Sequence, residues 1–225
     1  STPIVNQSIL FLRQGTDINN YVGIQKYLIQ FKDKLTPKPI NWSDSTDGVW
    51  NGRKAGTYNW YEIQDSVAYW EEFLSPKIFS TKVSLKPTFS YDDEGLFSSN
   101  TSYFIPVKKD GLYLLAILNS KISYFISKHV FVGKQNNYYE VQPTALEAFP
   151  IPLASNHQKY VLETLVNEII ISKERPKLER LMNALVYQLF FPEEFKAAGI
   201  NLFQICTKIG LLNCSDNPDF QQTLA

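Results

Sequence analysis

The sequence predicts an α+β protein: a mixed, curved β-sheet with flanking helices up to about residue 152, then a helical C-terminal extension. Three observations predict this. Residues 77–106 form short β-branched and aromatic runs joined by turn residues, as strands do. Residues 24–35 and 112–125 repeat apolar side chains at helical spacing. Residues 153–199 carry two longer apolar stripes of the same kind, which we expect to pack in a core or against another domain.

Composition limits the class of protein before any element is assigned. The chain has 225 residues and 44% hydrophobic content, enough to bury a sizeable core. Its 22 basic and 22 acidic residues cancel, so any affinity for nucleic acid must come from local patches or from a partner domain. No apolar run approaches the roughly 18 residues of a membrane span. Cys206 and Cys214 have no metal-site spacing, and reduced thiols in a cytoplasmic protein are expected.

In the first third of the chain, the sequence predicts one helix between two extended segments. Residues 4–12 read as a strand, and the apolar face of 24–35 ends at Pro37. Residues 40–56 read as a long loop, a feature that is often functional in a compact domain. Residues 57–63 read as a further strand.

The block at 50–65 carries a basic pair, Arg53 and Lys54, in a turn between Gly52 and Gly56, followed by three aromatic side chains, Tyr58, Trp60 and Tyr61. Aromatic planes beside cationic groups can form a nucleic-acid surface. They can equally form the entry of an ordinary strand, with the aromatic residues in the core. Both interpretations stay open on composition alone.

The middle of the chain carries a second basic stretch. After the strand, acidic turn and strand of 86–106, a buried helix is expected at 112–125. From there to Glu140 the chain contains lysines and asparagines without an acidic residue. This stretch is a second plausible nucleic-acid patch. The acidic turn at 92–94 is read as a solvated hairpin tip, with a metal site as the open alternative.

No catalytic constellation is recognisable. The sequence lacks a glycine-rich phosphate loop, a His-Glu-x-x-His zinc motif and the Asn-Pro-Pro-aromatic motif of amino-methyltransferases. His129 and His157 have no nucleophile in a supporting arrangement. The chain starts at Ser-Thr-Pro without an initiator Met, so we expect a piece of a longer protein, without catalytic activity of its own.

Five segments together resemble one known family. They are WNGRKAGTYNWYEIQD, FLSPKIFSTKVSLKPTFSYDDEG, YLLAILNSKISYF, LEAFPIP and, later, KLERLMNALVYQLFFPEEFKAAGI. In this order they resemble the TaqI-like C-terminal specificity domain of restriction-modification enzymes. The resemblance implies a target-recognition domain that reads double-stranded DNA from the major groove while a catalytic domain flips the target adenine.

The resemblance also implies partners and a division of labour. Residues 1–152 would form the recognition domain and residues 153–225 a helical extension. Methyltransferase and endonuclease domains of the parent chain would use S-adenosylmethionine and Mg²⁺, and this chain would hold no cofactor. The alternative, from a different class, is a protein-interaction or structural module, favoured by the neutral charge and the apolar stripes.

Residue chemistry then selects the side chains expected at DNA. Arginine grips guanine and asparagine grips adenine through paired hydrogen bonds, while lysine more often holds phosphate. The expected contacts are Arg53, Lys54, Lys77, Lys121, Lys128, Lys134, Asn136 and Asn137.

Overall fold

The chain folds into two compact units, which are described separately. The structure is a computed structural model that describes residues 8–171 and 175–208. Of the described residues, 8–71 form the N-terminal unit, and 72–171 and 175–208 form the main unit. The predicted α+β class is confirmed, because helices accompany small antiparallel sheets and the C-terminal part is helical.

The N-terminal unit contains short helices and long ordered loops. Its elements are η1 (Ile18–Asn20), α1 (Val22–Leu28), η2 (Ile29–Phe31) and α2 (Lys32–Leu35). The predicted helix at 24–35 is therefore present but divided, with a 3-10 turn in its middle. The predicted strand at 4–12 falls partly outside the described residues, and its described part, 8–12, is not a strand. The predicted strand at 57–63 is wrong, since these residues form turns.

The main unit carries two three-stranded antiparallel sheets where one mixed sheet was expected. The first has the order β3-β1-β4, from β1 (Lys77–Thr81), β3 (Phe89–Asp92) and β4 (Ser102–Pro106). The two strands predicted on either side of the acidic turn are present there, but the predicted solvated hairpin tip is wrong. Strand β1 lies between β3 and β4, and Asp92 is buried against Lys77. The second has the order β2-β6-β5, from β2 (Val83–Ser84), β5 (Val132–Gly133) and β6 (Tyr139–Glu140).

The helix predicted at 112–125 is two helices, α3 (Gly111–Leu118) and α4 (Lys121–Val130). Ser120 separates them: its hydroxyl accepts the Ser123 N–H at 3.2 Å, which makes it the N-cap of α4. The side chain of Asn119 is bonded to the backbone of Phe89 rather than to its own helix. The apolar residues keep helical spacing on both sides of the break, so the spacing alone predicts one continuous helix.

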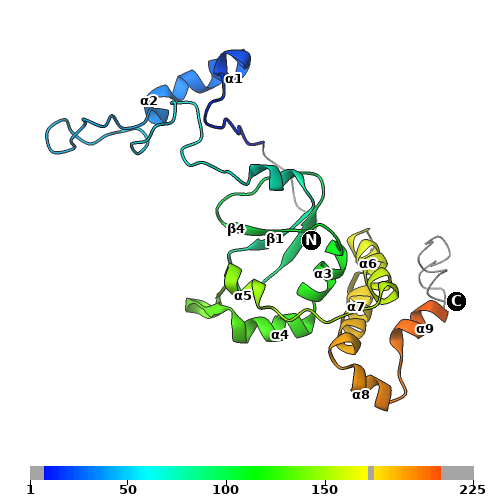
Figure 1. Ribbon diagram of the computed structural model, residues 1–225. Helices are drawn as coiled ribbons and strands as arrows, with labels where there is room; N and C mark the ends of the chain where they lie inside the picture. Colours follow the sequence, from blue (N-terminus) through cyan, green and yellow to red (C-terminus); the bar gives the residue numbers. More distant parts are fainter. Residues whose placement is uncertain (1–7, 172–174, 209–225) are drawn as a thin grey trace. The chain divides into compact units, whose positions relative to one another are not determined.

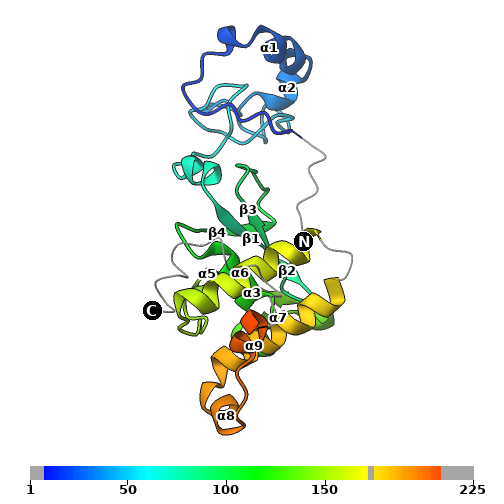
Figure 2. The same cartoon turned by 90° about the vertical axis from the view of Figure 1, so that its right-hand side faces the viewer.

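The remaining elements complete a layered arrangement. They are η3 (Trp70–Leu74), η4 (Gln135–Asn137), α5 (Pro143–Glu147), α6 (Asn156–Ile171), α7 (Arg175–Phe190), α8 (Pro192–Ala197) and α9 (Leu202–Lys208). Helix α3 packs on the first sheet through β3 and β1, and it packs on α6 and α7 as well (Figure 1, Figure 2).

The core of the main unit runs through all of these layers. Ile78, Ile117, Leu162 and Leu185, from the sheet, α3, α6 and α7, are completely buried. The apolar stripes after residue 152 therefore face inward. The predicted division at residue 152 into a recognition domain and an extension stays a prediction about function.

Candidate nucleic-acid interface

Arg53 is the hydrogen-bonding centre of the N-terminal unit. Its Nε donates to the Leu35 carbonyl at 2.7 Å and its Nη1 to the Glu62 carbonyl at 2.7 Å. Its Nη2 donates to the carbonyls of Trp60 and Asn59 at 2.9 and 3.3 Å. Four of the five guanidinium N–H donors are thus engaged by backbone, which leaves little of the fork for a guanine.

Glu62 binds backbone N–H groups in the N-terminal unit, as Arg53 binds backbone carbonyls, and its side chain is buried. Its carboxylate accepts the Gly15 N–H at 2.7 Å and the Asn59 N–H at 2.6 Å. Burial alone would raise the pKa of Glu62. The hydrogen bonds to its carboxylate lower the pKa by more than burial raises it, so the pKa lies below its usual value. The Glu62 N–H in turn donates to the Asn59 carbonyl at 3.0 Å. This reciprocal pair closes a turn, which explains why residues 57–63 are not a strand.

The loop at 40–56 is held in one conformation by its own aromatic residues. The rings of Trp42 and Trp50 meet edge to face, with centroids 4.9 Å apart. Trp42 donates to the Gly48 carbonyl at 2.8 Å, and Trp50 donates to the Thr36 carbonyl at 3.3 Å. A Cβ on Gly52 would lie 2.3 Å from the Thr36 carbonyl oxygen, so only glycine permits this approach.

Lys54 lies at the surface of the N-terminal unit. Its Nζ is 3.3 Å from an Asp65 carboxylate oxygen, and both side chains are mostly exposed. An exposed pair of this kind contributes about 0–1 kcal/mol and is readily exchanged for another partner. The adjacent predicted contacts thus differ: Lys54 is available to a ligand, whereas Arg53 is committed to the fold.

Lys77 lies inside the main unit. Its side chain is completely buried, and its ammonium forms an ion pair with Asp92, the residue opposite it on β3. It also donates to the backbone carbonyls of Phe73 and Ser75. Asp92 accepts the N–H groups of Glu94 and Leu96 as well. Lys77 therefore organises the sheet and the acidic turn, and we leave it out of the proposed interface.

Lys121 and Lys128 lie at opposite ends of α4, and both side chains are exposed. The backbone N–H of Lys121 donates to Asn183 Oδ1 at 2.6 Å, which ties the start of α4 to α7. The ammonium of Lys128 lies 4.5 Å from the ring centroid of Tyr124. A third lysine, Lys86, lies 5.5 Å from the same centroid and was missed from the sequence. The signal for it was the absence of any acidic residue in 77–91.

Lys134, Asn136 and Asn137 belong to the exposed hairpin between β5 and β6. Asn136 and Asn137 both have a left-handed backbone, with φ of 58° and 61°, a conformation that asparagine tolerates better than most residues. The Lys134 ammonium pairs with Glu140 at 2.6 Å, and this hydrogen bond lowers the pKa of Glu140. The structure thus gathers three predicted contacts on one hairpin, directly after the helix that carries two others.

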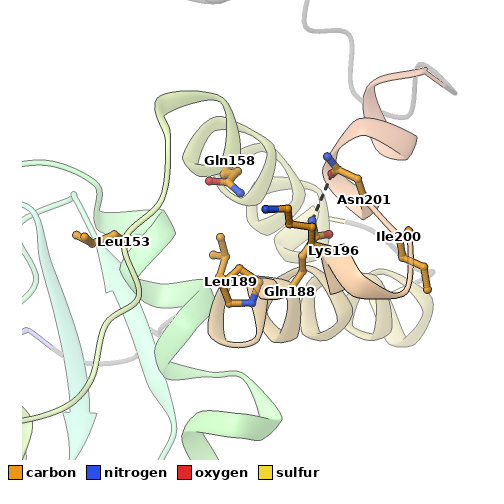
Figure 3. Close-up of a pocket in the computed structure, with 9 residues that line it drawn as sticks. Leu153, Gln158, Gln188, Leu189, Lys196, Ile200 and Asn201 are labelled. Carbon is orange, nitrogen blue, oxygen red and sulfur yellow. Dashed lines mark hydrogen bonds between the residues drawn. The ribbon is translucent and has the colours of Figure 1, made fainter. Parts of the chain in front are cut away.

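Two cavities of the main unit contain polar side chains. One, of about 540 Å³, is lined by residues of α6, α7 and α8 and of the segments beside them, including Gln158, Gln188 and Lys196 (Figure 3). Gln188 donates to Asn201 Oδ1 at 3.3 Å and accepts the Leu202 N–H at 2.8 Å, so this amide joins α7 to α9. The other cavity, of about 240 Å³, lies where α3, α4, α6 and α7 approach the segment before β3.

Two features are absent from the part of the chain that the structure describes. In residues 8–171 and 175–208, no three His, Cys, Asp or Glu side chains are grouped so as to hold a metal ion. Over the same part of the chain, every helix is too short or too polar to span a membrane.

Comparison with known proteins identifies the family of the chain. No curated protein matches the sequence. The family described as the TaqI-like C-terminal specificity domain matches residues 11–151, a range that includes loop 40–56, the first sheet, α4 and the β5–β6 hairpin. Because this match spans more than half of the sequence, the chain belongs to the family of TaqI-like C-terminal specificity domains.

Proposed function

We propose that the chain recognises a specific sequence of double-stranded DNA as the specificity domain of a restriction-modification enzyme. The family match over residues 11–151 is the observation that carries this proposal. The exposed lysines and asparagines of the main unit support it, because they supply phosphate contacts and adenine-type amide contacts in a chain with no net charge.

In this proposal the β5–β6 hairpin reads bases. Its tip presents Asn136 and Asn137, both exposed, and the left-handed backbone of both residues fixes where the amides project. A paired amide contact to adenine contributes about 1–3 kcal/mol of discrimination against the wrong base. Lys134 can exchange Glu140 for a phosphate, and Lys54 can do so on the N-terminal unit.

The chemistry of modification and cleavage lies outside this chain in the same proposal. Methyltransferase and endonuclease parts of the parent enzyme would bring S-adenosylmethionine and Mg²⁺, and the whole would act on DNA in the cytoplasm. The specificity domain would supply only the choice of site.

The experiment is selection of bound duplexes from a random pool by the full-length protein. We expect one short sequence to be enriched. Asn136→Gly and Asn137→Gly remove the amides but retain the left-handed backbone, and each should relax preference at one position by roughly 5- to 150-fold. Asn167→Ala, at an exposed position of α6, is the control and should enrich the wild-type sequence. Failure of the wild-type protein to enrich any sequence would refute the proposal.

The protein-interaction alternative loses one of its two supports. The apolar stripes after residue 152 are core, since residues such as Leu165 and Val186 are buried among α3, α6 and α7. The double variant Asn136→Gly/Asn137→Gly of the full-length protein separates the two functions, because it leaves intact the fold that Arg53 holds together. Loss of selected-duplex binding supports recognition, and unchanged binding favours the alternative.

A further inference from the structure

Two exposed lysines of the main unit, Lys86 and Lys128, lie against the ring of Tyr124, and a third, Lys121, lines the same cavity as Lys86. We call Lys86, Lys121, Lys128 and Tyr124 the lysine–tyrosine cluster. The ammonium groups of Lys128 and Lys86 lie 4.5 and 5.5 Å from the Tyr124 ring centroid. Lys86 and Lys121 both line the cavity of about 240 Å³.

Backbone-directed bonds assemble this cluster from two distant segments. The Asn119 amide accepts the Phe89 N–H at 3.1 Å and donates to the Phe89 carbonyl at 3.0 Å. This clamp holds the segment carrying Lys86 beside the start of α4. Strand β2, which ends two residues before Lys86, pairs with β6 of the hairpin. The cluster and the hairpin tip therefore belong to one continuous piece of structure.

The positive charge of the cluster is not neutralised by nearby acids. Residues 77–91 and 121–139 contain no Asp or Glu. Among the described residues, the nearby acids already have other partners: Asp92 pairs with Lys77, Glu140 with Lys134 and Glu179 with Arg175. Cation–π contact with Tyr124 contributes about 0.5–1 kcal/mol at an exposed site, but it leaves the positive charge of both ammonium groups in place.

We propose that the lysine–tyrosine cluster binds the phosphodiester backbone of the DNA duplex, beside the bases read by the hairpin. This inference rests on the proposed function and names a different contact within it. Lysine is a compact, hydrated charge that suits phosphate and carries no sequence information. A concentrated patch of lysines allows a chain of zero net charge to bind a polyanion locally.

The test compares Lys86→Gln/Lys128→Gln with wild type in the full-length protein. Affinity for the selected duplex and for a scrambled duplex is measured between 50 and 250 mM salt. The slope of log affinity against log salt should fall by about 0.9 for each lysine removed, on both duplexes. The ratio of the two affinities should stay at the wild-type value. Lys196→Gln on α8 removes one positive charge outside the cluster. Lys86→Arg/Lys128→Arg keeps both positive charges of the cluster. Each of these two control variants should keep the wild-type slope.

A second measurement in the wild-type protein does not depend on a variant folding. Either duplex should protect Lys86 and Lys128 from acylation, whereas Lys196 should react equally with and without DNA. A wild-type slope in the Gln double variant, or unprotected Lys86 and Lys128, would overturn the inference while leaving an enriched sequence intact. Absence of any enriched sequence with the wild-type protein would instead be the failure of the proposed function.

Discussion

At the scale of single residues, the most consequential side chains of the N-terminal unit point inward rather than toward a ligand. Arg53 and Glu62 together satisfy backbone carbonyls and N–H groups from 15 to 62. Leaving a buried backbone group without its partner costs about 1–3 kcal/mol, so each of these side chains secures more stability than its own burial provides.

Arg53→Ala should therefore destabilise the N-terminal unit by at least about 2 kcal/mol. Three of the four tryptophans, Trp42, Trp50 and Trp60, lie well inside this unit and Trp70 lies at its boundary, so tryptophan fluorescence during urea unfolding reports mainly on it. Arg53→Lys should lose nearly as much, because an ammonium cannot reproduce the planar fork. Lys26→Ala, at an exposed position of α1, is the control. Unchanged unfolding of Arg53→Ala with weakened DNA binding would return Arg53 to the interface.

Glu62 predicts a dependence on pH. The pKa of Glu62 is lowered in the folded state, so its carboxylate stabilises the unit above the ordinary value near 4.5. This contribution is lost as the pH falls through the lowered value. Glu62→Gln should be less stable than wild type at pH 7, and the difference should shrink toward pH 3. Thermal unfolding followed by tryptophan fluorescence measures this; Asp65→Asn, at an exposed carboxylate, is the control. A difference that does not change with pH would contradict it.

At the scale of elements, the junction between α3 and α4 is the least regular and the most informative part of the main unit. Ser120 starts a new helix, and Asn119 joins the end of α3 to the first residue of β3. This junction sets the direction of α4, and with it the position of Lys121 and Lys128.

Asn119→Ala should lower the free energy of unfolding of the main unit by about 1–3 kcal/mol, because both backbone groups of Phe89 lose their partner. Urea unfolding followed by helix circular dichroism gives this value. Asn119→Asp keeps the acceptor for the Phe89 N–H but loses the donor to the Phe89 carbonyl. Its free energy of unfolding should lie between those of the wild type and Asn119→Ala. Asn167→Ala, on the exposed face of α6, should unfold as wild type does. Equal stability of all four proteins would show that the clamp is not structural.

Sequence patterns located the elements better than they located the side chains. Helical stripes and the two strands on either side of the acidic turn in 86–106 follow from periodicity and turn residues, and all are present. Three features needed tertiary contacts. The turn at 57–63 depends on Glu62 reaching back to Asn59, the helix break depends on Asn119 bonding Phe89, and the burial of Lys77 depends on Asp92 lying opposite it. Spacing along the chain cannot reveal any of these partners.

The candidate contacts divide along the same line. Positions in the acid-free segment 121–139, such as Lys128 and Asn136, stay predicted DNA contacts, and the structure leaves both side chains exposed. Arg53 and Lys77 were assigned to DNA on residue type, and the structure gives both a role in the fold. Lys86 was missed because only folding brings it beside Tyr124.

At the scale of the whole molecule, the two units are stabilised in different ways. In the described part of the N-terminal unit the buried side chains are Leu12, Ile18, Tyr58 and Glu62. The main unit buries a continuous apolar core from the first sheet through α7. Because apolar burial is the dominant source of folding stability, the main unit is expected to be much the more stable.

Unfolding should therefore proceed in two transitions. Tryptophan fluorescence, which reports mainly on the N-terminal unit, should change at lower urea concentration than helix circular dichroism, which is dominated by α6 and α7. Addition of the selected duplex should move the fluorescence transition to higher urea, since a ligand stabilises the state that binds it. Coincident transitions without DNA would show that the units fold as one cooperative body.

The bonds of Arg53 have a consequence for how the N-terminal unit tolerates substitution. They end on backbone carbonyls, so they do not depend on which side chains occupy the residues they join. Exposed positions of this unit can then be exchanged in evolution while these bonds stay the same. A unit held together in this way can change its surface by substitution alone, without a compensating change in its interior.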